Sequence, residues 1–434
     1  MTKPPRQIRL NLNLQTAGRH DAAWKTLPDA AGLVTDVDYY VRVARLAEKG
    51  KLDGIFFADS LGSLSENSVR RPWRGLDPTV LLSAIAQHTS AIGLVSTVPA
   101  IHGSPFVTAR QIASLDHVSK GRAAWNIITS QNPPTLDALG KTEALDSETR
   151  YRKAGEFVEI VTGLWDSLPQ EAIVNDPTRD LYIDESQTRP VEYEGEFYST
   201  NAVLPLTGGH RGRPVLFQAG ASARSREFGA TWADALFTGQ RTKQLAQRFS
   251  ADVKGLAAQH GRDPEKLLVL PGLWVIVGDT EQAAHARKAE LDAQLDADYL
   301  LEQLAERLGI AASRLVLDEE LPYDELSAPL EDTLVARHRE QIIAEARGRL
   351  TVRQLLYNNL TGGHRVLIGT PEQIADDIAD WVDDGASDGF NINIDRQPDG
   401  LESFIDGPVA VLQNRGRFRA DYEFETLREN LGVA

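Results

Sequence analysis

Residues 52–60, which read LDGIFFADS, are apolar almost throughout and close on a carboxylate followed by a serine. Strands that are covered on both faces of a parallel sheet have this composition. Seven further short apolar runs alternate with longer stretches, and several of these runs are also apolar nearly throughout; they lie at 8–14, 91–101, 122–130, 214–220, 234–239, 267–278 and 389–394. Eight strands alternating with helices predict an α/β protein with a (β/α)8 TIM barrel, and a doubly wound sheet is the competing topology.

The longer stretches carry helix signals. Apolar residues recur at helical spacing in 37–44 and in 374–382. Before the second of these, Thr370 is a capping residue, Pro371 suits the first helical position and Gln373 stands where a capping box needs it. We therefore expect helices between the strands, as a barrel of this kind requires.

Composition and charge narrow the functional classes. The chain has 434 residues, 42% hydrophobic and 25% charged, which is ordinary for a globular protein. Its net charge of −16 argues against a nucleic-acid partner. It contains no cysteine, which excludes disulfides, thiolate catalysis and cysteine-held metal centres. Because it has neither an apolar run of about 20 residues nor a signal peptide, we expect a cytoplasmic protein that does not bind membranes.

Two long insertions interrupt the alternation. The stretch 171–213 is rich in Pro, Gly, Asp and Thr, and its residues 191–198 form a plausible hairpin. The stretch 280–349 is dense in Ala, Leu, Glu and Arg and indicates several exposed helices. Both are expected to carry structure of their own, either as solvated decoration or as a lid over the barrel mouth. With a C-terminal extension at 401–434, the prediction is one barrel domain spanning 1–434.

Polar residues at the carboxyl ends of the predicted strands are candidates for a site, because that end of a barrel holds the active site. Asp59 closes the first run quoted above, Thr97 lies late in the run that follows it and Asn126 lies in the next. An amide both donates and accepts, which suits the edge of a heterocycle. Each residue also has a structural interpretation that stays open. Asp59 could cap the next segment, Thr97 could be an ordinary strand residue, and the Asn126 amide could be satisfied by a backbone group.

The segment 217–224, FQAGASAR, leads from a strand through small residues into a helix. Free backbone N–H groups at a helix start bind phosphate, and Ser222 adds a hydroxyl. The alternative is an ordinary helix cap after a tight turn. The common nucleotide-binding motifs and the nucleophile elbow are missing, and the nine histidines form no closely spaced pair, so no metal site is predicted.

Six segments, taken in order, resemble one family. They read FADS (57–60), ASLDHVSKGR (113–122), AWNIITS (124–130), QAGAS (218–222), IGTPEQ (368–373) and DGFN (388–391). Together they resemble the bacterial-luciferase-like flavin monooxygenases, and within them the branch of nitrilotriacetate, dibenzothiophene-sulfone and long-chain alkane monooxygenases. The resemblance extends from the first strand to about Arg419.

The resemblance implies a barrel that binds reduced FMN at its mouth, with FMNH2 supplied by a separate NAD(P)H-dependent flavin reductase. It implies that the reduced flavin reacts with O2 to give a C4a-hydroperoxide. This species would oxygenate a small organic substrate by C–N or C–S bond oxidation or by hydroxylation. Members of the family are commonly dimers or tetramers, so a homodimer or homotetramer is expected.

The residues that the resemblance assigns to flavin binding are Asp59, Thr97, Asn126, Tyr151, Gly220, Ala221 and Ser222. The first three would line the isoalloxazine ring. The tyrosine corresponds to the family's Tyr near the flavin phosphate and ribityl chain, and the last three would hold the phosphate.

The substrate pocket departs from the family pattern. Many relatives carry a histidine at the position of Val107, and here His102 is the nearby imidazole. The loop 18–24 resembles the family's histidine- and tryptophan-bearing loop and contributes His20 and Trp24. These three are candidates at the mouth, each also interpretable as a packing or rim residue, and no catalytic acid or base is assigned.

Three other functions stay open. A deazaflavin-dependent oxidoreductase of the same superfamily would transfer hydride without oxygen. A cofactor-free barrel hydrolase would use Asp59 with a distant acid such as Glu156 or Glu192. A flavin-binding protein without turnover is the third.

Overall fold

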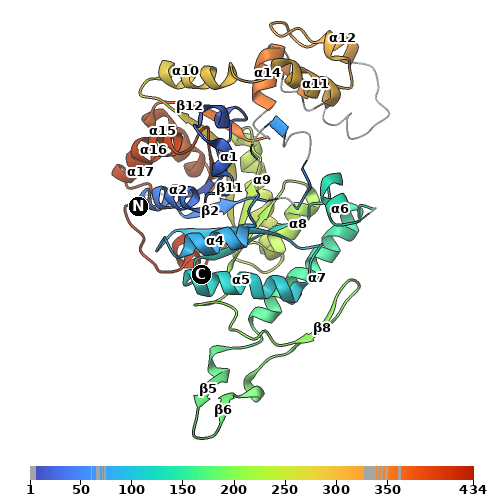
Figure 1. Cartoon of the computed structure of the whole chain (residues 1–434), viewed down its shortest axis with the longest axis vertical. Helices are drawn as coiled ribbons and strands as arrows, with labels where there is room; N and C mark the ends of the chain where they lie inside the picture. Colours follow the sequence, from blue (N-terminus) through green and yellow to red (C-terminus); the bar gives the residue numbers. More distant parts are fainter. Residues whose placement is uncertain are drawn as a thin grey trace.

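Eight parallel strands close into a barrel, as the alternation predicts (Figure 1). They are β1 (Arg9–Asn13), β2 (Gly54–Phe57), β3 (Gly93–Pro99), β4 (Ala123–Ile128), β9 (Val215–Ala219), β10 (Ala235–Thr238), β11 (Leu268–Val277) and β13 (Gly389–Ile394). In this order each strand is hydrogen-bonded to the next, and β13 returns to β1. Because the ring is closed, the doubly wound alternative is wrong.

The structure is a computed structural model that describes residues 6–434 apart from 60, 65–68, 71, 73–74, 142, 327–338, 341, 344–345, 348–349 and 360–362. Ser60, which ends the segment FADS, and part of the expected insertion 280–349 therefore lie outside the described residues. No helix in the described part of the chain is long and apolar enough to cross a membrane.

A ninth strand, β12 (Arg365–Gly369), is one that the sequence pattern does not indicate. It pairs with Leu273–Val277 of β11, whereas β10 pairs with Leu268–Pro271. Since β13 occupies the other edge of β11 at Gly272–Val275, β12 continues the edge that β10 leaves. Most of β12 is only half-buried and its apolar run is three residues long, so it lacks the signature of a barrel strand.

Helices cover the outside of the barrel (Figure 1). The longer ones are α2 (Val37–Lys49), α4 (Pro78–Ala86), α5 (Pro105–Ser119), α7 (Ser147–Trp165), α8 (Ala223–Trp232), α9 (Lys243–Gln259) and α15 (Pro371–Asp383). Shorter segments are η1 (Ala23–Thr26), α1 (Ala30–Leu33), α6 (Pro133–Ala138), η4 (Pro264–Lys266), α16 (Asp399–Phe404), η6 (Ile405–Val409), α17 (Ala410–Asn414) and α18 (Leu427–Leu431). The expected capping box is present at the start of α15, between Thr370 and Gln373.

The amino-terminal end of the lumen is filled by apolar side chains. Phe56, Phe217 and Leu270 meet there, and Leu427 and Leu431 of α18 pack against the same cluster. The C-terminal segment therefore closes the base of the barrel.

A buried ion pair reinforces this closure. Asp53, directly before β2, pairs with Arg419, and both side chains are almost fully buried. The carboxylate of Asp53 also accepts a hydrogen bond from the backbone N–H of Leu10 at 2.6 Å. The pair thus ties the C-terminal segment to the first two strands.

The first insertion forms two small antiparallel sheets. It contains η2 (Gln170–Ala172), β5 (Ile173–Asp176), β6 (Leu181–Ile183), η3 (Glu185–Gln187), β7 (Val191–Glu194) and β8 (Ser199–Ala202). The expected hairpin is present as the pair β7–β8, and β5–β6 projects away from the barrel (Figure 1). The insertion connects α7 to β9, so it leaves from the base of the barrel, and β7–β8 packs along α7. The solvated-decoration and lid interpretations of this insertion both stay predictions.

The second insertion is helical, as its composition predicts. It contains α10 (Glu281–Asp292), α11 (Ala297–Leu308), η5 (Ala312–Arg314) and α12 (Tyr323–Leu326), and α14 (Val352–Asn359) follows it. The segments after α10 share an apolar core of their own, which includes Leu304, Leu308 and Leu355.

This helical insertion contacts the loops that leave the carboxyl ends of β1 and β2. Lys25 donates a hydrogen bond to the carbonyl of Gln294 at 2.5 Å. Arg70 pairs with Asp296 at 2.6 Å, and its guanidinium lies 3.8 Å from the centre of the Tyr299 ring. The insertion therefore borders the barrel mouth.

Candidate active site

The lumen changes from apolar to polar along the barrel axis. Successive residues of a strand point to opposite sides, and the leucines of β1 pack in the helix layer, which turns Asn11 and Asn13 inward. The same alternation in β13 turns Asn391 and Asn393 inward. Asn13 donates a hydrogen bond to the Oδ1 atom of Asn393 at 2.8 Å, across the junction of β1 and β13. Above its apolar base, the lumen is thus lined by amides.

Thr97 and Asn126 meet in the lumen on the neighbouring strands β3 and β4. They are register partners, 3% and 2% exposed, and the Nδ2 atom of Asn126 donates to the Oγ1 atom of Thr97 at 3.0 Å. The Oδ1 atom of Asn126 is buried and has no hydrogen-bond partner in the described part of the chain. A buried carbonyl without a donor costs about 1–3 kcal/mol, so this atom fits an N–H donor of a bound heterocycle. A backbone group, the structural alternative for the amide, does not satisfy it.

Asp59 lies at the end of the next strand around the ring. It comes two residues after Phe57, the last residue of β2, and is half-buried. Because β2 is hydrogen-bonded to β3, Asp59 stands beside the end of the strand that carries Thr97. The three residues assigned to the flavin ring, Asp59, Thr97 and Asn126, are therefore contributed by three consecutive strands on one side of the mouth.

The turn between β9 and α8 exposes a helix start. Gly220 has a φ of +153°, and a Cβ atom there would lie 2.1 Å from the Oγ atom of Ser225, so only glycine fits. Ser222 caps α8 by accepting the N–H of Ser225 at 3.2 Å. The cap and a phosphate site are compatible, because the N–H groups of Ala223 and Arg224 have no acceptor among the described residues. Ala221 and Ser222 are exposed to solvent.

The start of α7 is tied to the start of α8 by charged side chains. Asp146 caps α7 by accepting the N–H of Glu148 at 2.8 Å. Glu148 pairs with Arg224 of α8 at 2.8 Å and with Arg152 one turn along α7 at 3.4 Å. Arg152 in turn pairs with Glu196 in the β7–β8 turn at 3.0 Å. The hairpin, α7 and α8 are thus held as one unit.

Tyr151 lies between these two helices. Its ring centre is 5.6 Å from that of Phe228 on α8, and α7 packs along α8. The structure therefore brings Tyr151 and the turn that carries Ser222 to the same corner, at the starts of two adjacent helices.

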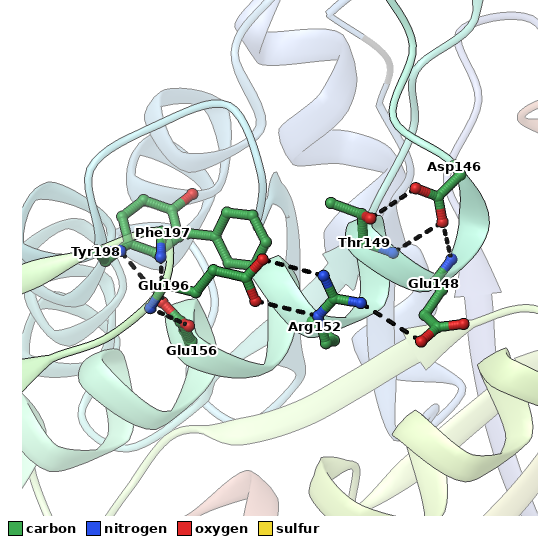
Figure 2. A network of polar contacts seen from close by, with 8 residues as sticks. All are labelled: Asp146, Glu148, Thr149, Arg152, Glu156, Glu196, Phe197 and Tyr198. Atoms are coloured by element: carbon green, nitrogen blue, oxygen red, sulfur yellow. Dashed lines mark hydrogen bonds and ion pairs between the residues drawn. The ribbon is translucent and has the colours of Figure 1, made fainter.

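The acids considered for a hydrolase do not lie at the mouth. The carboxylate of Glu156 accepts the backbone N–H groups of Glu196, Phe197 and Tyr198 at 2.8, 2.9 and 3.1 Å, which makes it the anchor of the β7–β8 turn (Figure 2). Glu192 is exposed on β7. Neither of these two acids is placed to act with Asp59.

The three residues expected at the substrate pocket are held by other parts of the chain. His20 is buried, accepts the N–H of Ala22 on Nδ1 at 3.1 Å and contacts the carboxylate of Asp292 through Nε2 at 3.1 Å. Trp24 donates its Nε1–H to the carbonyl of residue 70 at 3.0 Å. His102 contacts the carbonyl of Ser130 through Nε2 at 2.6 Å, and burial lowers its pKa. Their place in substrate binding stays a prediction.

Two aromatic residues that the sequence pattern did not single out face the lumen. Trp274 is 1% exposed and its Nε1–H has no acceptor among the residues described. The His364 ring lies 5.2 Å from that of Phe237, stacked at 14°, and its Nδ1 atom is buried without a partner. The paired asparagines of β1 and β13 also went unnoticed, although the strings NLN (11–13) and NIN (391–393) display a polar stripe of period two.

Within the described residues, no cluster of three or more His, Asp or Glu side chains is arranged to hold a metal ion. The buried, partly unpaired groups of the mouth are amides, hydroxyls and aromatic N–H groups. Such a donor set suits an organic ligand.

Comparison with known proteins identifies the family. The model of the luciferase-like monooxygenases matches residues 15–388. N-acetyl-S-(2-succino)cysteine monooxygenase of Bacillus subtilis is 40% identical over 100% of this chain and 98% of its own length. Nitrilotriacetate monooxygenase component A of Aminobacter aminovorans is 36% identical over 99% of this chain and 97% of its own. A riboflavin lyase whose structure contains a modified FMN and riboflavin superposes with a TM-score of 0.82 at 27% identity, covering 98% of this chain and 96% of that one.

Proposed function

Because the chain belongs to the luciferase-like monooxygenase family, we propose that it uses reduced FMN and O2 to oxygenate a small organic molecule. The observation that carries the proposal is the buried, unpaired Oδ1 atom of Asn126 beside Thr97. Candidate reactions are oxidation at a C–N or C–S bond and hydroxylation. Bound reduced FMN would supply the electrons that activate O2.

The chain's own residues would bind and orient the flavin from one side of the mouth. Asn126 would accept a hydrogen bond from a ring N–H, and Thr97 holds the amide in position for it. Asp59 would approach the ring from the end of the neighbouring strand. The N–H groups at the start of α8, with the Ser222 hydroxyl, would hold the phosphate, and Gly220 lets the backbone come close.

The pair formed by α7 and α8 would fix the other end of the cofactor. Tyr151 would lie near the phosphate and ribityl chain, and the ion pair between Glu148 and Arg224 keeps the two helix starts together. Arg224 is thus a positioning residue for the turn that carries Ser222. The helical insertion at the mouth would exclude water from the bound reactants.

A separate NAD(P)H-dependent flavin reductase would supply FMNH2. The relative named as component A supports a two-component system. A homodimer or homotetramer is the assembly that the family resemblance favours, and size-exclusion chromatography with light scattering would measure it.

The test is an anaerobic titration of the full chain with reduced FMN, followed by fluorescence and calorimetry, with oxidised FMN and a reduced deazaflavin as comparisons. We expect preferential binding of reduced FMN and, once the reductase and NAD(P)H are added in air, substrate-dependent oxygen consumption that requires both proteins. Preference for the deazaflavin would favour the hydride-transferring alternative. No binding of reduced FMN above buffer would refute the proposal.

A further inference from the structure

The helices α4 and α5 share an outer face that carries very little charge. They lie side by side on the outside of the barrel (Figure 1), and Gln87, directly after α4, donates a hydrogen bond to the carbonyl of Val118 on α5 at 3.4 Å. The exposed residues of the two helices include a single charged side chain; they are Val80, Val107, Arg110, Gln111, Ser114 and Val118.

A solvated helix of the same barrel has a different composition. The exposed residues of α15 are mostly acidic; they are Glu372, Gln373, Asp376, Asp380 and Asp383. Because charged residues make up 25% of the chain, their scarcity on the α4–α5 face is a local feature. Depletion of charge distinguishes the centre of a protein–protein interface from the rest of a surface.

The two helices border a groove of about 620 Å³ whose lining is largely apolar. Leu115 is buried at this groove and Phe106 is half-buried. Val80, Val107 and Val118 also line it, with 69%, 52% and 42% of their surface exposed. Single exposed apolar residues are ordinary, whereas a group of them at one place marks a contact site.

The hydroxyl groups in this groove are already satisfied within the chain. Ser83 donates to the carbonyl of Thr79, and Ser114 donates to that of Arg110, both at 2.7 Å. The hydroxyl of Thr79 is bonded to that of Ser96 on β3 at 2.9 Å. A polar group is costly to bury only when it loses its hydrogen bonds. Covering this face with another surface therefore costs little in desolvation.

The charged residues that line the groove are one acid and one base. Asp77 caps α4 by accepting the N–H groups of Thr79 and Val80 at 2.9 and 3.0 Å. Arg110 is exposed and has no carboxylate partner in the part of the chain that the structure describes. The groove is thus neutral, although the chain has a net charge of −16. Two copies of the chain repel each other overall, but not at this face.

We propose that the α4–α5 face binds the same face of a second copy of this chain in a two-fold symmetric contact. Because such a contact uses one patch twice, the patch must be complementary to itself. The neutral groove meets this requirement, since Arg110 of each copy would pair with Asp77 of the other. Gln111 would bond to its own counterpart, because an amide both donates and accepts. The proposal rests on the homo-oligomer of the proposed function and names the surface through which its copies meet.

Sedimentation and light scattering of the full chain measure the assembly, and Val107→Asp tests the face. Val107 is the third residue of α5, where a carboxylate is favourable to a helix, so the variant should stay folded. Leu245→Asp is the matched control, since Leu245 is the third residue of α9 and is 50% exposed. We expect the parent to be a dimer or a multiple of one. Val107→Asp should weaken its association at least tenfold, and the control less than twofold.

A second readout uses the lack of cysteine in the chain. Residues near a two-fold axis lie close to their own counterparts, so a single cysteine in the middle of the exposed face of α5 should form a disulfide between two copies. Gln111→Cys and Ser114→Cys are the test variants, and Ala251→Cys, exposed on α9, is the control. Under mild oxidation we expect a covalent dimer from at least one test variant and none from the control.

A monomeric parent at micromolar concentration would overturn the inference. An assembly that is unchanged by Val107→Asp, with neither test cysteine crosslinked faster than the control, would also overturn it. If Val107→Asp leaves the assembly intact and instead weakens binding of the flavin reductase, the face belongs to that partner and the inference is again overturned.

Reduced FMN is titrated into the same preparations of the parent. Flavin binding by a chain whose assembly is insensitive to Val107→Asp refutes the α4–α5 contact alone. Loss of assembly in that variant, without flavin binding by the parent, supports the contact and refutes the monooxygenase proposal.

Discussion

Replacing Asn126 by leucine should separate flavin binding from stability. The residue sits in β4 with one amide atom bonded to Thr97 and the other buried and unpaired. Leucine has the same number of side-chain heavy atoms with the same branching, and no polar atom. If Asn126 serves the cofactor, the variant should fold at least as well as the parent and bind reduced FMN poorly.

The expected magnitudes follow from the two amide atoms. Loss of the bond to Thr97 costs about 0.5–1.5 kcal/mol, whereas removal of an unpaired buried oxygen recovers about 1–3 kcal/mol. The free energy of unfolding of the flavin-free chain should therefore change by between about 0.5 kcal/mol lost and 2.5 kcal/mol gained. Binding should weaken by about 1–3 kcal/mol, roughly 5- to 150-fold, because the flavin N–H would now be buried without an acceptor.

Urea unfolding and anaerobic titration with reduced FMN measure the two effects. Asn430→Leu is the matched control, because Asn430 is a buried amide whose groups are all bonded. It donates to the carbonyls of Phe424 and Thr426 at 2.8 and 2.9 Å and accepts the N–H of Phe424 at 3.4 Å. Its loss should cost about 1.5–4.5 kcal/mol of stability, at about 0.5–1.5 kcal/mol for each bond, and leave flavin affinity unchanged.

The reasoning is refuted if Asn126→Leu loses more than about 1.5 kcal/mol of stability, beyond the cost of one hydrogen bond, while its flavin affinity changes less than about twofold, a difference of only ~0.4 kcal/mol. That combination would make Asn126 a structural residue of the barrel. The cofactor assignment of Thr97 would fall with it, since the two side chains act as a pair.

Other substitutions and a pH titration test separate parts of the molecule. Ser222→Ala should weaken reduced-FMN binding by about 1.5–3 kcal/mol, the value of one hydrogen bond to an ionised group. The control Thr242→Ala removes the cap of α9 and should cost only about 1 kcal/mol of stability without changing flavin affinity. If the two variants bind reduced FMN with the same affinity, the phosphate site is contradicted. Arg419→Met leaves the carboxylate of Asp53 buried without its cation, so urea unfolding at pH 7 should show a loss of about 3–5 kcal/mol, and a smaller loss than that of a surface pair would contradict the buried geometry. The pKa of His364 is lowered to about 4 in the folded chain, so as the pH falls below about 6.5 the unfolded chain binds the proton first. Stability should therefore drop by up to about 3 kcal/mol between pH 6.5 and 4, and an unchanged profile in His364→Gln would contradict that shift.

The barrel was predictable because its strands are buried on both faces. The apolar composition of runs such as LDGIFFADS indicates that they are buried, and all eight barrel strands lie within the runs identified from the sequence. The start of α15 was predictable for a local reason, since its capping box involves only residues 370–373. The strand β12 was not predicted because it pairs with one neighbour, β11, and most of it is half-buried, so no long run of apolar residues marks it.

The candidate site was predictable to different degrees on its two sides. Thr97 and Asn126 lie on consecutive strands, so their positions in two neighbouring runs were enough to bring them together. The position of His364 depends on three segments far apart in the chain: its own, the bare backbone of Gly272 and the ring of Phe237. No local sequence pattern indicates that these three segments meet, and in the sequence His364 is only a histidine after two glycines.

The unpaired polar groups lie at the mouth, away from the end of the barrel that holds the strands together. The apolar base, closed by α18 and by the pair of Asp53 with Arg419, holds the strands together at one end of the axis. The unpaired atoms of Asn126, Trp274 and His364 lie in the other half, where each costs stability until a ligand satisfies it. Substitutions at the base should therefore lower the free energy of unfolding by several kcal/mol, whereas apolar substitutions at the mouth should cost little stability, or raise it, while weakening ligand binding. A barrel whose mouth were merely structural would show losses of stability at both ends.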